Sequence, residues 1–309
     1  MNWLNRLKKN KKIVVIGTVF LDIKGYPEPP FEPTGRNIGR IEYRYGGVAR
    51  NVAADLAEMG LHPLFVSMTD PKGQGEEIAA DLERKGVDLQ YLLRQEDSIG
   101  TWMVILDPEG EVCANLSKRQ NLEPLCSLLL EKGKEIFRDA DGILLEMDVD
   151  ENLAEMVFSL AKAAHTRVYG VISNIHVAME RMRHLVKTDC FVCNRSEAGT
   201  LFGISTEQMT SGELLELLDR ERRRIGMNQM IVTMDKDGAV YSSDRESGYC
   251  PAQPVKLVDS TGAGDSFFAG VSAGLISGFS LSEACQFGSL IAASVITSTE
   301  NVYCRNGRD

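Results

Sequence analysis

The sequence predicts an α/β fold in which a mostly parallel sheet is covered by helices on both faces. Two observations lead to this prediction. Short apolar runs alternate along the chain with longer segments of helical periodicity. The apolar runs are also continuous, as in strands that are buried on both faces. The expected strands are 13–17, 63–67, 142–146, 167–172, 189–193 and 230–234. The expected helices are 48–59, 75–85, 151–164, 176–186, 211–225, 264–277 and 281–297.

Individual elements rest on local patterns, taken here in chain order. The first strand is an apolar run at 13–16. Strand 189–193 contains two cysteines with the spacing of a redox or metal pair, but no second Cys or His pair lies nearby, so a buried strand is favoured. Helix 264–277 has glycines at every fourth residue, which favours close packing on a neighbour. Ligands of such sheets gather at the carboxyl ends of the strands, where we expect the motifs to converge.

Two segments, at about 36–45 and 99–116, break this pattern. Residues 40–45 alternate polar and apolar side chains, as in a half-exposed strand. Further on, Asp-Pro-Glu-Gly at 107–110 is typical of a turn because Pro stands early and Gly last, and short apolar runs flank it. Together the segments predict a small antiparallel sheet, separate from the main one. A surface hairpin without function is the alternative.

Composition excludes some function classes. The chain has 309 residues and a formal charge of -10, which argues against a general nucleic-acid or membrane-surface binder, because both need a basic face. We expect a single domain over residues 12–309, preceded by a basic, solvated leader at 1–11. No stretch approaches the ~18 apolar residues of a membrane span. Seven cysteines, an odd number, favour reduced thiols and a cytoplasmic location.

The most informative stretch is Asp-Ser-Thr-Gly-Ala-Gly-Asp at 259–265, which follows an extended segment and opens a helix. Its two glycines let the backbone turn tightly and approach a ligand. The first amides of the helix have no intrahelical partner, so the turn predicts an anion site, with phosphate as the usual anion. Asp265 can take a proton from an attacking hydroxyl there, as the catalytic aspartate of kinases does. The alternative is an ordinary strand-to-helix turn with Asp265 as a cap.

This run resembles the second signature of the ribokinase-like (PfkB) family of sugar and nucleoside kinases. Three further motifs stand in the family's order. Residues 17–22 resemble the family's first strand with its substrate-binding aspartate, and 46–53, running on to 60, resemble the first signature. Asn-Arg-Ser-Glu at 194–197 matches the Asn-x-x-Glu motif. The resemblance implies a ribokinase-like fold and ATP-dependent phosphoryl transfer to a small molecule. It also implies that the small sheet is a lid over the acceptor and a candidate surface for a homodimer.

The resemblance assigns roles to single residues. Asp265 is the expected general base, and the amides of Gly262, Ala263 and Gly264 are the expected anion hole. The expected acceptor-binding residues fall in the first strand and the first signature, and they are Asp22, Gly46, Gly47 and Asn51. The expected ATP-binding residues fall in three loops that follow the sheet, and they are Asn194, Lys236, Gly238, Thr261, Gly262 and Gly264.

Two metal sites are expected. Asn194 and Glu197 stand three residues apart, so they share a face of a helical turn. An amide and a carboxylate can organise hydrated Mg²⁺ beside a triphosphate, and the alternative is a helix cap with a capping-box glutamate. Asp259 and Thr261 resemble residues that bracket a monovalent-cation site in some family members. The expected cofactors are therefore ATP and Mg²⁺, with K⁺ as a further candidate.

The expected acceptor is a hydroxymethyl group on a nucleoside or furanose sugar. Arg50, the run 171–173 and the ending 297–302 resemble the pseudouridine kinase branch. Met-Thr-Asp at 68–70 departs from a Gly-Asp-Asp pattern of the family, which leaves a free-sugar kinase as an alternative. A catalytically inactive binding or regulatory protein is disfavoured because Asp265 and its glycines are intact. An oxidoreductase is disfavoured because the dinucleotide fingerprint is missing.

Overall fold

The structure, a computed structural model, describes residues 3–29, 31–107, 112–180 and 182–305. Its centre is a nine-stranded sheet with the strand order β13-β12-β11-β10-β9-β8-β1-β4-β5. The strands from β5 to β11 pair in parallel, and β12 and β13 extend the sheet through antiparallel pairs. The nine strands are β1 (Ile13–Ile16), β4 (Leu64–Thr69), β5 (Leu92–Arg94), β8 (Gly142–Glu146), β9 (Val168–Val171), β10 (Cys190–Asn194), β11 (Gln229–Thr233), β12 (Ala239–Ser243) and β13 (Ser247–Cys250).

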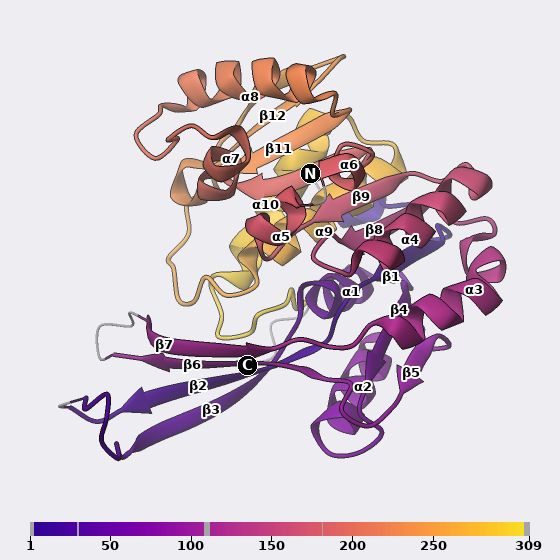
Figure 1. Ribbon diagram of the computed structural model, residues 1–309. Coiled ribbons are helices and arrows are strands. Elements are labelled where there is room, and N and C mark those ends of the chain that lie inside the picture. The colour runs from indigo at the N-terminus through magenta and orange to yellow at the C-terminus, as the bar shows by residue number, and fades with distance from the viewer. Residues whose placement is uncertain (1–2, 30, 108–111, 181, 306–309) are drawn as a thin grey trace.

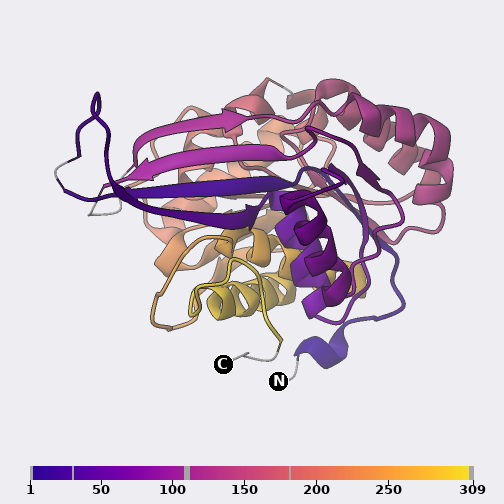
Figure 2. The ribbon, with the colours of Figure 1, turned by 90° about the horizontal axis from the view of Figure 1, so that it is seen from below.

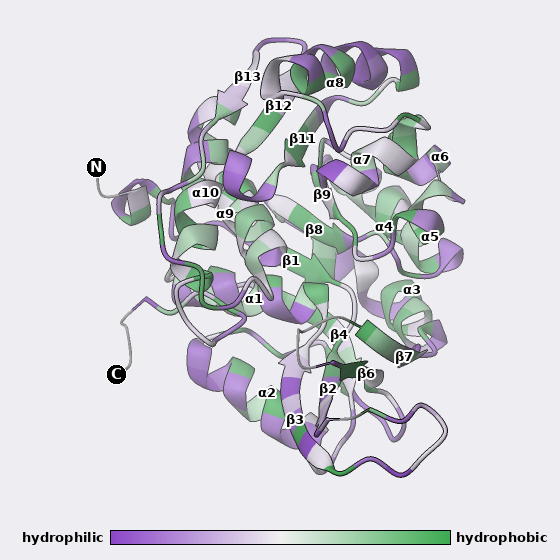
Figure 3. Ribbon diagram, turned by 90° about the vertical axis from the view of Figure 1, so that its left-hand side faces the viewer, coloured by the Kyte–Doolittle hydropathy of each residue, from purple (hydrophilic) through white to green (hydrophobic). Residues whose placement is uncertain are grey.

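Helices cover both faces of this sheet (Figure 1). One face packs against α1 (Val48–Glu58), α2 (Gln74–Lys85), α9 (Ala263–Ser277) and α10 (Leu281–Val295). The other face packs against α3 (Glu123–Phe137), α4 (Glu151–Ala164), α5 (Ile175–Met179), α6 (Met182–Leu185), α7 (Arg195–Phe202) and α8 (Ser211–Ile225). Successive residues of β1 alternate between the two cores because side chains alternate across a strand. The central strands are accordingly mostly hydrophobic (Figure 3).

All six expected strands are present, with ends that differ by at most two residues from the prediction. The predicted fold class is therefore confirmed. Several elements were not expected, namely α3, α7, β5 and the antiparallel pair β12 and β13. The expected helix 176–186 is divided between α5 and α6, and the expected helix 281–297 ends at Val295. The extended segment expected before the 259–265 run is not a strand, since residues 251–257 belong to no strand or helix.

Helix α9 packs closely against α10 through glycine residues. A Cβ atom built on Gly270 would lie 2.8 Å from the Cα atom of Gly288 on α10, so neither position leaves room for a side chain. One turn later, a Cβ atom on Gly274 would meet the ring of Phe279 at 2.9 Å. The close packing expected from the glycine spacing is thus confirmed.

A second sheet of four strands projects from the main body (Figures 1 and 2). Its order is β3-β2-β6-β7, and we call it the lid sheet. Its strands are β2 (Phe20–Pro27), β3 (Gly39–Gly46), β6 (Gly100–Leu106) and β7 (Val112–Lys118). The predicted separate sheet is confirmed, but its purely antiparallel character was wrong, because β2 pairs with β6 in parallel. Most of the predicted turn at 107–110 lies outside the described residues.

Asp22 was expected in the first strand of the main sheet, but it belongs to the lid sheet. Strand β1 ends at Ile16, and residues 17–19 connect it to β2, which contains Asp22. Gly17 begins this connection, where no side chain fits, because a Cβ atom on it would lie 2.6 Å from both Ala49 and Glu146. The chain therefore passes directly from the carboxyl end of β1 into the lid.

Part of the described leader packs against the rest of the protein, while Asn5, Lys8, Lys9 and Asn10 are exposed. The ring of Trp3 lies 5.7 Å from that of Phe279 and 6.3 Å from that of Phe287. Arg6 forms an ion pair with Glu283 on α10 at 2.7 Å, and Leu7 is buried. Within the described residues, no helix is long and apolar enough to cross a membrane.

Candidate active site

The glycine turn before α9 has a shape that only glycine permits. Gly262 has φ 81° and ψ -5° and caps the helix, and a Cβ atom on it would lie 2.0 Å from the carbonyl oxygen of Asn301. Gly264 has open space beside its Cα atom. The amide of Ala263 already donates to the Ser260 carbonyl at 3.2 Å. The turn thus presents an open helix start, in which Ala263 is the least available of the three expected amides.

Asp265 lies in the first turn of α9 and is held from α1. Its Oδ2 accepts a hydrogen bond from Asn51 Nδ2 at 2.7 Å. The pKa of Asp265 is raised to about 7, mainly by burial; the bond from Asn51 opposes the rise, and the charges of Asp22 and Glu197 add to it. These couplings place side chains of α9, α1, β2 and α7 around one carboxylate, so four of the sequence motifs converge as expected.

The carboxylate of Asp22 lies against the first glycine pair. A Cβ atom on Gly46 would lie 2.5 Å from Asp22 Oδ2, and one on Gly47, which has φ 98°, would lie 2.6 Å from the Thr18 carbonyl oxygen. Burial raises the pKa of Asp22 to about 6, although Lys24 opposes the rise. The glycines therefore make room for Asp22 and for the connection that leads to the lid.

The lid also contacts the loop that contains Asp259. Lys24 Nζ on β2 donates to Thr261 Oγ1 at 3.4 Å, and the amide of Thr261 donates to Asp259 Oδ1 at 2.8 Å. Burial would raise the pKa of Asp259, but the Thr261 bonds and the charges of Lys24 and Arg44 hold it below its usual value. Asp259 is therefore an ionised carboxylate beside the glycine turn.

Asn194 and Glu197 form the capping box that was the alternative interpretation. Asn194 Oδ1 accepts from the Glu197 amide at 2.8 Å, and Glu197 Oε2 accepts from the Asn194 amide at 2.7 Å. Burial raises the pKa of Glu197, and the nearby charge of Asp148 adds to this rise. Among the described residues, no three Asp, Glu, His or Cys side chains form a group able to hold a metal by themselves.

Lys236 and Gly238 lie at the same edge of the sheet, one strand away from Asn194. Asn194 pairs with Thr233 at the end of β11, and Lys236 follows in a short 3-10 helix (Asp235–Asp237), where it is exposed. Gly238 has φ 87°, and a Cβ atom on it would lie 2.1 Å from the Cys250 carbonyl oxygen. The structure thus brings both residues to the predicted edge but shows no contact of theirs with Asp265.

Two acidic residues at the carboxyl end of β8, Glu146 and Asp148, were not predicted as site residues. Glu146 is buried and accepts hydrogen bonds from the amide and the hydroxyl of Thr18 at 2.9 Å. Burial raises its pKa to about 7, and Asp148 adds to the rise. Asp148 accepts from Ser173 and Asn174, and its Oδ1 is buried without a partner in the described structure. Their place at the carboxyl end of a predicted parallel strand was the signal that could have found them.

Helix α1 contributes two further polar side chains that were not predicted as site residues. Arg50 is buried beside Asn51, to which its Nη1 donates at 3.1 Å. Asp55 is buried one turn later and accepts from the Ser266 hydroxyl at 2.8 Å and from the Tyr303 amide at 2.6 Å. Burial raises the pKa of Asp55 to about 8. The sequence signal that could have identified Arg50 and Asp55 is a charged residue within an otherwise apolar helix.

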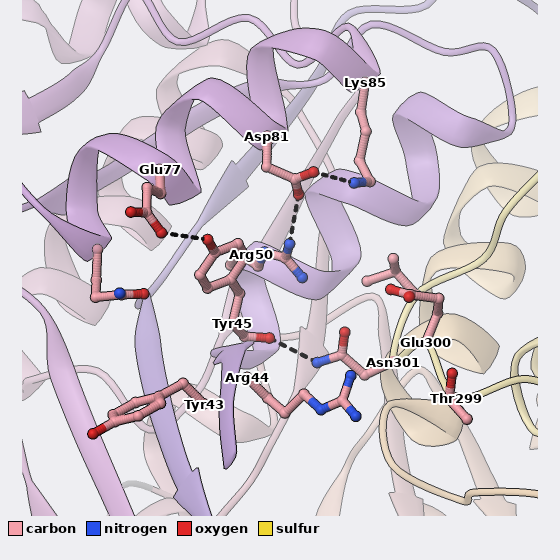
Figure 4. A pocket seen from close by; sticks show the side chains of 12 residues that line it. Tyr43, Arg44, Tyr45, Arg50, Glu77, Asp81, Lys85, Thr299, Glu300 and Asn301 are labelled. Carbon is pink, nitrogen blue, oxygen red and sulfur yellow. Dashed lines mark hydrogen bonds and ion pairs between the residues drawn. The ribbon is translucent and has the colours of Figure 1, made fainter. Parts of the chain in front are cut away.

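A cavity of about 380 Å³ adjoins this cluster (Figure 4). It lies between strand β3 of the lid, helix α2 and the segment 299–302. Asn301 closes one side, where its Nδ2 donates to the Tyr45 carbonyl oxygen at 2.7 Å. The same residue packs against Gly262, so the cavity and the glycine turn share a wall.

The arrangement suits transfer of a charged group to a hydroxyl. A carboxylate with a pKa near neutrality can accept a proton, and an open helix start beside it can stabilise an anion. A model of pfkB family carbohydrate kinases matches residues 10–306. Guanosine-inosine kinase of Exiguobacterium acetylicum is 34% identical over 94% of this chain and 96% of that protein. Pseudouridine kinase of Escherichia coli is 23% identical over 97% and 100% of the two chains.

Solved structures share the fold. Arabidopsis thaliana ribokinase, solved with ribose and ATP, superposes with a TM-score of 0.80 over 96% of each chain at 21% identity. Giardia lamblia ribokinase superposes with a TM-score of 0.81 over 96% of each chain at 17% identity. The family match covers nearly the whole sequence, including every motif around Asp265. The chain therefore belongs to the pfkB family of carbohydrate kinases and is a phosphotransferase that acts on an alcohol group of a sugar or nucleoside.

Proposed function

We propose that the protein phosphorylates the hydroxymethyl group of a nucleoside with ATP, and that Asp265 is the general base. One observation carries this proposal. A carboxylate with its pKa raised to about 7 stands in the first turn of α9, directly after the glycine turn. It can therefore deprotonate an acceptor hydroxyl at the place where the amides of Gly262 and Gly264 would stabilise the transferred phosphoryl group.

In the proposed reaction the acceptor hydroxyl gives its proton to Asp265. The hydroxyl oxygen of the acceptor then forms a bond to the γ-phosphorus of ATP. At the same time the bond between that phosphorus and the ADP oxygen breaks, and ADP leaves. The protein mainly positions these groups and neutralises charge, as phosphoryl transfer requires. Asp22 would hold the sugar hydroxyls, since one carboxylate can accept two such bonds.

The lid supports a nucleoside over a free sugar as the acceptor. Asp22 pairs directly with Trp102 on β6, and paired residues of neighbouring strands point to the same face. A half-buried indole thus lies beside the carboxylate proposed to hold the sugar. Base-on-aromatic stacking contributes about 1–3 kcal/mol in other nucleic-acid sites. A free pentose has no base to stack on Trp102.

A purine nucleoside is the acceptor we favour within this class. The relative at 34% identity is named as a guanosine-inosine kinase, whereas the pseudouridine kinase relative is 23% identical. This order of similarity replaces the preference for pseudouridine that the motifs alone had suggested. Pseudouridine is the second candidate, and a free sugar of the ribose or fructose type is the third.

Mg²⁺ fits the donors at the ends of β8 and β10. Asp148 has a buried oxygen without a partner among the described residues, and its charge acts on Glu197. Two carboxylates and one amide suit a cation that keeps most of its waters. We propose that Asp148, Glu197 and Asn194 hold hydrated Mg²⁺, which would neutralise triphosphate charge. Asp259 is the proposed anionic partner of a monovalent cation such as K⁺.

A screen of acceptors tests the proposal. ADP release from ATP and Mg²⁺ is measured with guanosine, inosine, pseudouridine, other nucleosides, ribose and fructose. We expect turnover with purine nucleosides and at least tenfold lower kcat/KM with the free sugars. A preference for a free sugar would contradict the nucleoside assignment. No turnover with any acceptor would favour a binding protein that lacks catalysis.

The exposed face of the lid leads us to propose a homodimer. Ile23, Tyr43, Met103 and Leu116 occupy paired positions across the four strands, on the face opposite Asp22. Three of them are large and exposed. An apolar sheet face of this kind is suited to pairing with a second copy about a two-fold axis.

A further inference from the structure

Arg50 is a buried charge to which the reaction described so far gives no role. It lies in the first turn of α1, is 3% exposed, and its guanidinium lies 5.7 Å from the centre of the Tyr45 ring. Nη2 donates to Asp81 Oδ2 on α2 at 2.8 Å (Figure 4). Nη1 donates to Asn51 Oδ1 at 3.1 Å. Burial of a charge is costly unless it is paired, so this placement needs a reason.

The bond to Asn51 decides which end of its amide faces the catalytic carboxylate. A guanidinium only donates hydrogen bonds, so Asn51 must turn its carbonyl oxygen toward Arg50. Its Nδ2 then faces the other way and donates to Asp265 Oδ2 at 2.7 Å. A flipped amide would set its carbonyl oxygen against the ionised carboxylate. Arg50 therefore determines whether Asp265 receives a hydrogen bond or a repulsion.

We propose that Arg50 is a positioning residue for phosphoryl transfer, acting on Asp265 through the amide of Asn51. The proposal rests on the proposed function, because it requires Asp265 to be the base. While Asn51 holds Oδ2, Oδ1 stays free to take the proton of the acceptor hydroxyl. The hydroxyl oxygen then bonds to the γ-phosphorus as the bond to ADP breaks.

The partner that anchors Arg50 is itself fixed. Asp81 Oδ1 accepts from Lys85 at 2.5 Å and lies 3.3 Å from Arg84. Burial would raise the pKa of Asp81, but the bond from Lys85 and the charge of Arg50 hold it below its usual value. Asp81 is therefore ionised at neutral pH, and it keeps two cationic partners when Arg50 is replaced. A loss of activity on replacement cannot then be ascribed to an orphaned carboxylate.

The main test is Arg50→Met, which keeps much of the buried volume and removes the donors. Removing one partner of a buried ion pair usually destabilises a protein because the other charge is left unpaired, but Asp81 keeps Lys85 and Arg84 as partners. We expect kcat to fall about 10- to 100-fold, the usual cost of a misplaced catalytic group, with little change in the KM for ATP. A stabilising role alone would leave kcat of the folded enzyme unchanged.

The pH profile gives a readout that a stabilising role would not move. The bond from Asn51 lowers the pKa of Asp265, so its loss should move the acid limb of kcat/KM to higher pH. Asp22 on β2, Glu197 on α7 and Asp55 on α1 also face Asp265. Arg50 itself lowers the pKa of Asp22 and of Asp55, so Arg50→Lys, which keeps the charge and removes the planar fork of donors, decides whether the shift reports on the amide.

Free guanidinium provides a rescue experiment. The cavity of about 380 Å³ is lined by Arg50, so the ion can reach the space left in Arg50→Ala (Figure 4). We expect guanidinium to restore part of kcat at concentrations that leave the protein folded. Ammonium lacks the planar fork of donors and urea lacks the charge, so neither should restore it. If Arg50→Met fails to fold, Arg50→Lys keeps a cation opposite Asp81 and should show the same shifted acid limb.

Arg222→Met is the matched control. Arg222 is 1% exposed, lies on α8, and donates to Asp244 at 2.8 Å and to Ser242 at 2.9 Å. Its replacement should lower the melting temperature and leave the acid limb in place. The proposal is overturned if Arg50→Met retains the wild-type kcat and acid limb, or if guanidinium gives no rescue of Arg50→Ala.

Asp265→Asn separates this inference from the proposed function. Near-wild-type turnover in Asp265→Asn would refute the base and thus the proposed function. An inactive Asp265→Asn beside a fully active Arg50→Met would refute this inference alone. The double variant should be no slower than Asp265→Asn, because Arg50 acts through Asp265, and a further loss would contradict the proposed route.

Discussion

At the scale of single residues, the raised pKa of Asp265 links its geometry to a pH dependence. Burial is the main cause of the rise to about 7. A general base works only when it is deprotonated, so activity should be full above this pKa and fall as pH decreases through it. Below about pH 7, kcat/KM for the best acceptor should drop about tenfold per pH unit.

The first prediction is that Asp265→Asn lowers kcat by roughly 10²–10⁴-fold, the usual worth of general-base catalysis. The amide keeps the shape of the carboxylate but cannot accept the proton, so the acid limb near pH 7 should disappear as well. ATP binding, measured by calorimetry, should change little. Turnover close to that of the wild type would remove Asp265 from the role.

The second prediction concerns Glu197→Gln. The carboxylate both caps α7 and lies near Asp148. Gln can still accept the hydrogen bond from the Asn194 amide, so the cap should largely survive. If Glu197 also holds hydrated metal, the Mg²⁺ concentration for half-maximal activity should rise more than the KM of the acceptor. If the Mg²⁺ titration is unchanged and the melting temperature is lower, Glu197 acts only as a helix cap.

The sequence predicted the site residues whose role depends on local backbone. The 259–265 run and the Asn194–Glu197 pair each set a helix start within a few residues. Asp55 and Glu146 were not predicted because their partners are distant in the chain, and Arg50 was not predicted because its anchor Asp81 lies on another helix. Asp55 accepts from an amide 248 residues away, and Glu146 from one 128 residues away. Only the folded sheet brings such pairs together.

At the scale of elements, the strands with continuous apolar sequences were predicted, whereas β2, which combines polar and apolar residues without a regular pattern, was not. Strand β2 is half-exposed along its whole length and carries Asp22, Lys24 and Gly25, so it lacks an apolar run. Helix α3 was missed although its apolar face is buried. It contains Gly133, which lowers helix propensity. A Cβ atom there would lie 2.5 Å from Leu160 on α4, so the glycine serves helix packing.

The third prediction concerns strand β2 as the element that holds the acceptor. Asp22→Ala should raise the KM of the acceptor far more than that of ATP, because Asp22 is proposed to bind the sugar hydroxyls. The strand itself should persist, since its backbone pairs with β3 and β6 on both sides. Equal weakening of acceptor and ATP would instead mean that Asp22 maintains the connection between β1 and the lid.

At the scale of the whole molecule, the buried carboxyl of Glu146 should affect stability in a pH-dependent way. Its pKa is raised from 4.5 to about 7 in the folded protein, with burial as the main cause and Asp148 second. Below the unfolded pKa both states are protonated and no penalty arises. As pH rises from 4.5 to 7, the Glu146 carboxyl ionises in the unfolded state but stays largely protonated in the folded state. The free energy of unfolding therefore falls by about 3 kcal/mol through this group.

The fourth prediction is that Glu146→Gln loses this dependence. Its amide can accept from the Thr18 amide and donate to the Thr18 hydroxyl, so both present bonds have replacements. Urea unfolding at about pH 5 and about pH 8 should show the variant gaining stability relative to the wild type at the higher pH. An equal difference at both pH values would mean that Glu146 is ionised throughout.

The fifth prediction is that the lid face opposite Asp22 joins two chains. Light scattering at micromolar concentration should give twice the mass of one chain. Leu116 is 66% exposed on β7, an edge strand of the lid sheet, and Leu116→Asp should give the single-chain mass, because a carboxylate buried between two apolar sheets is costly. Leu130→Asp is the control, since Leu130 is 78% exposed on α3, away from the lid. It should leave the dimer intact. A wild-type monomer would refute the dimer but not the kinase, because Asp265, Asn51 and Asp22 all come from one chain.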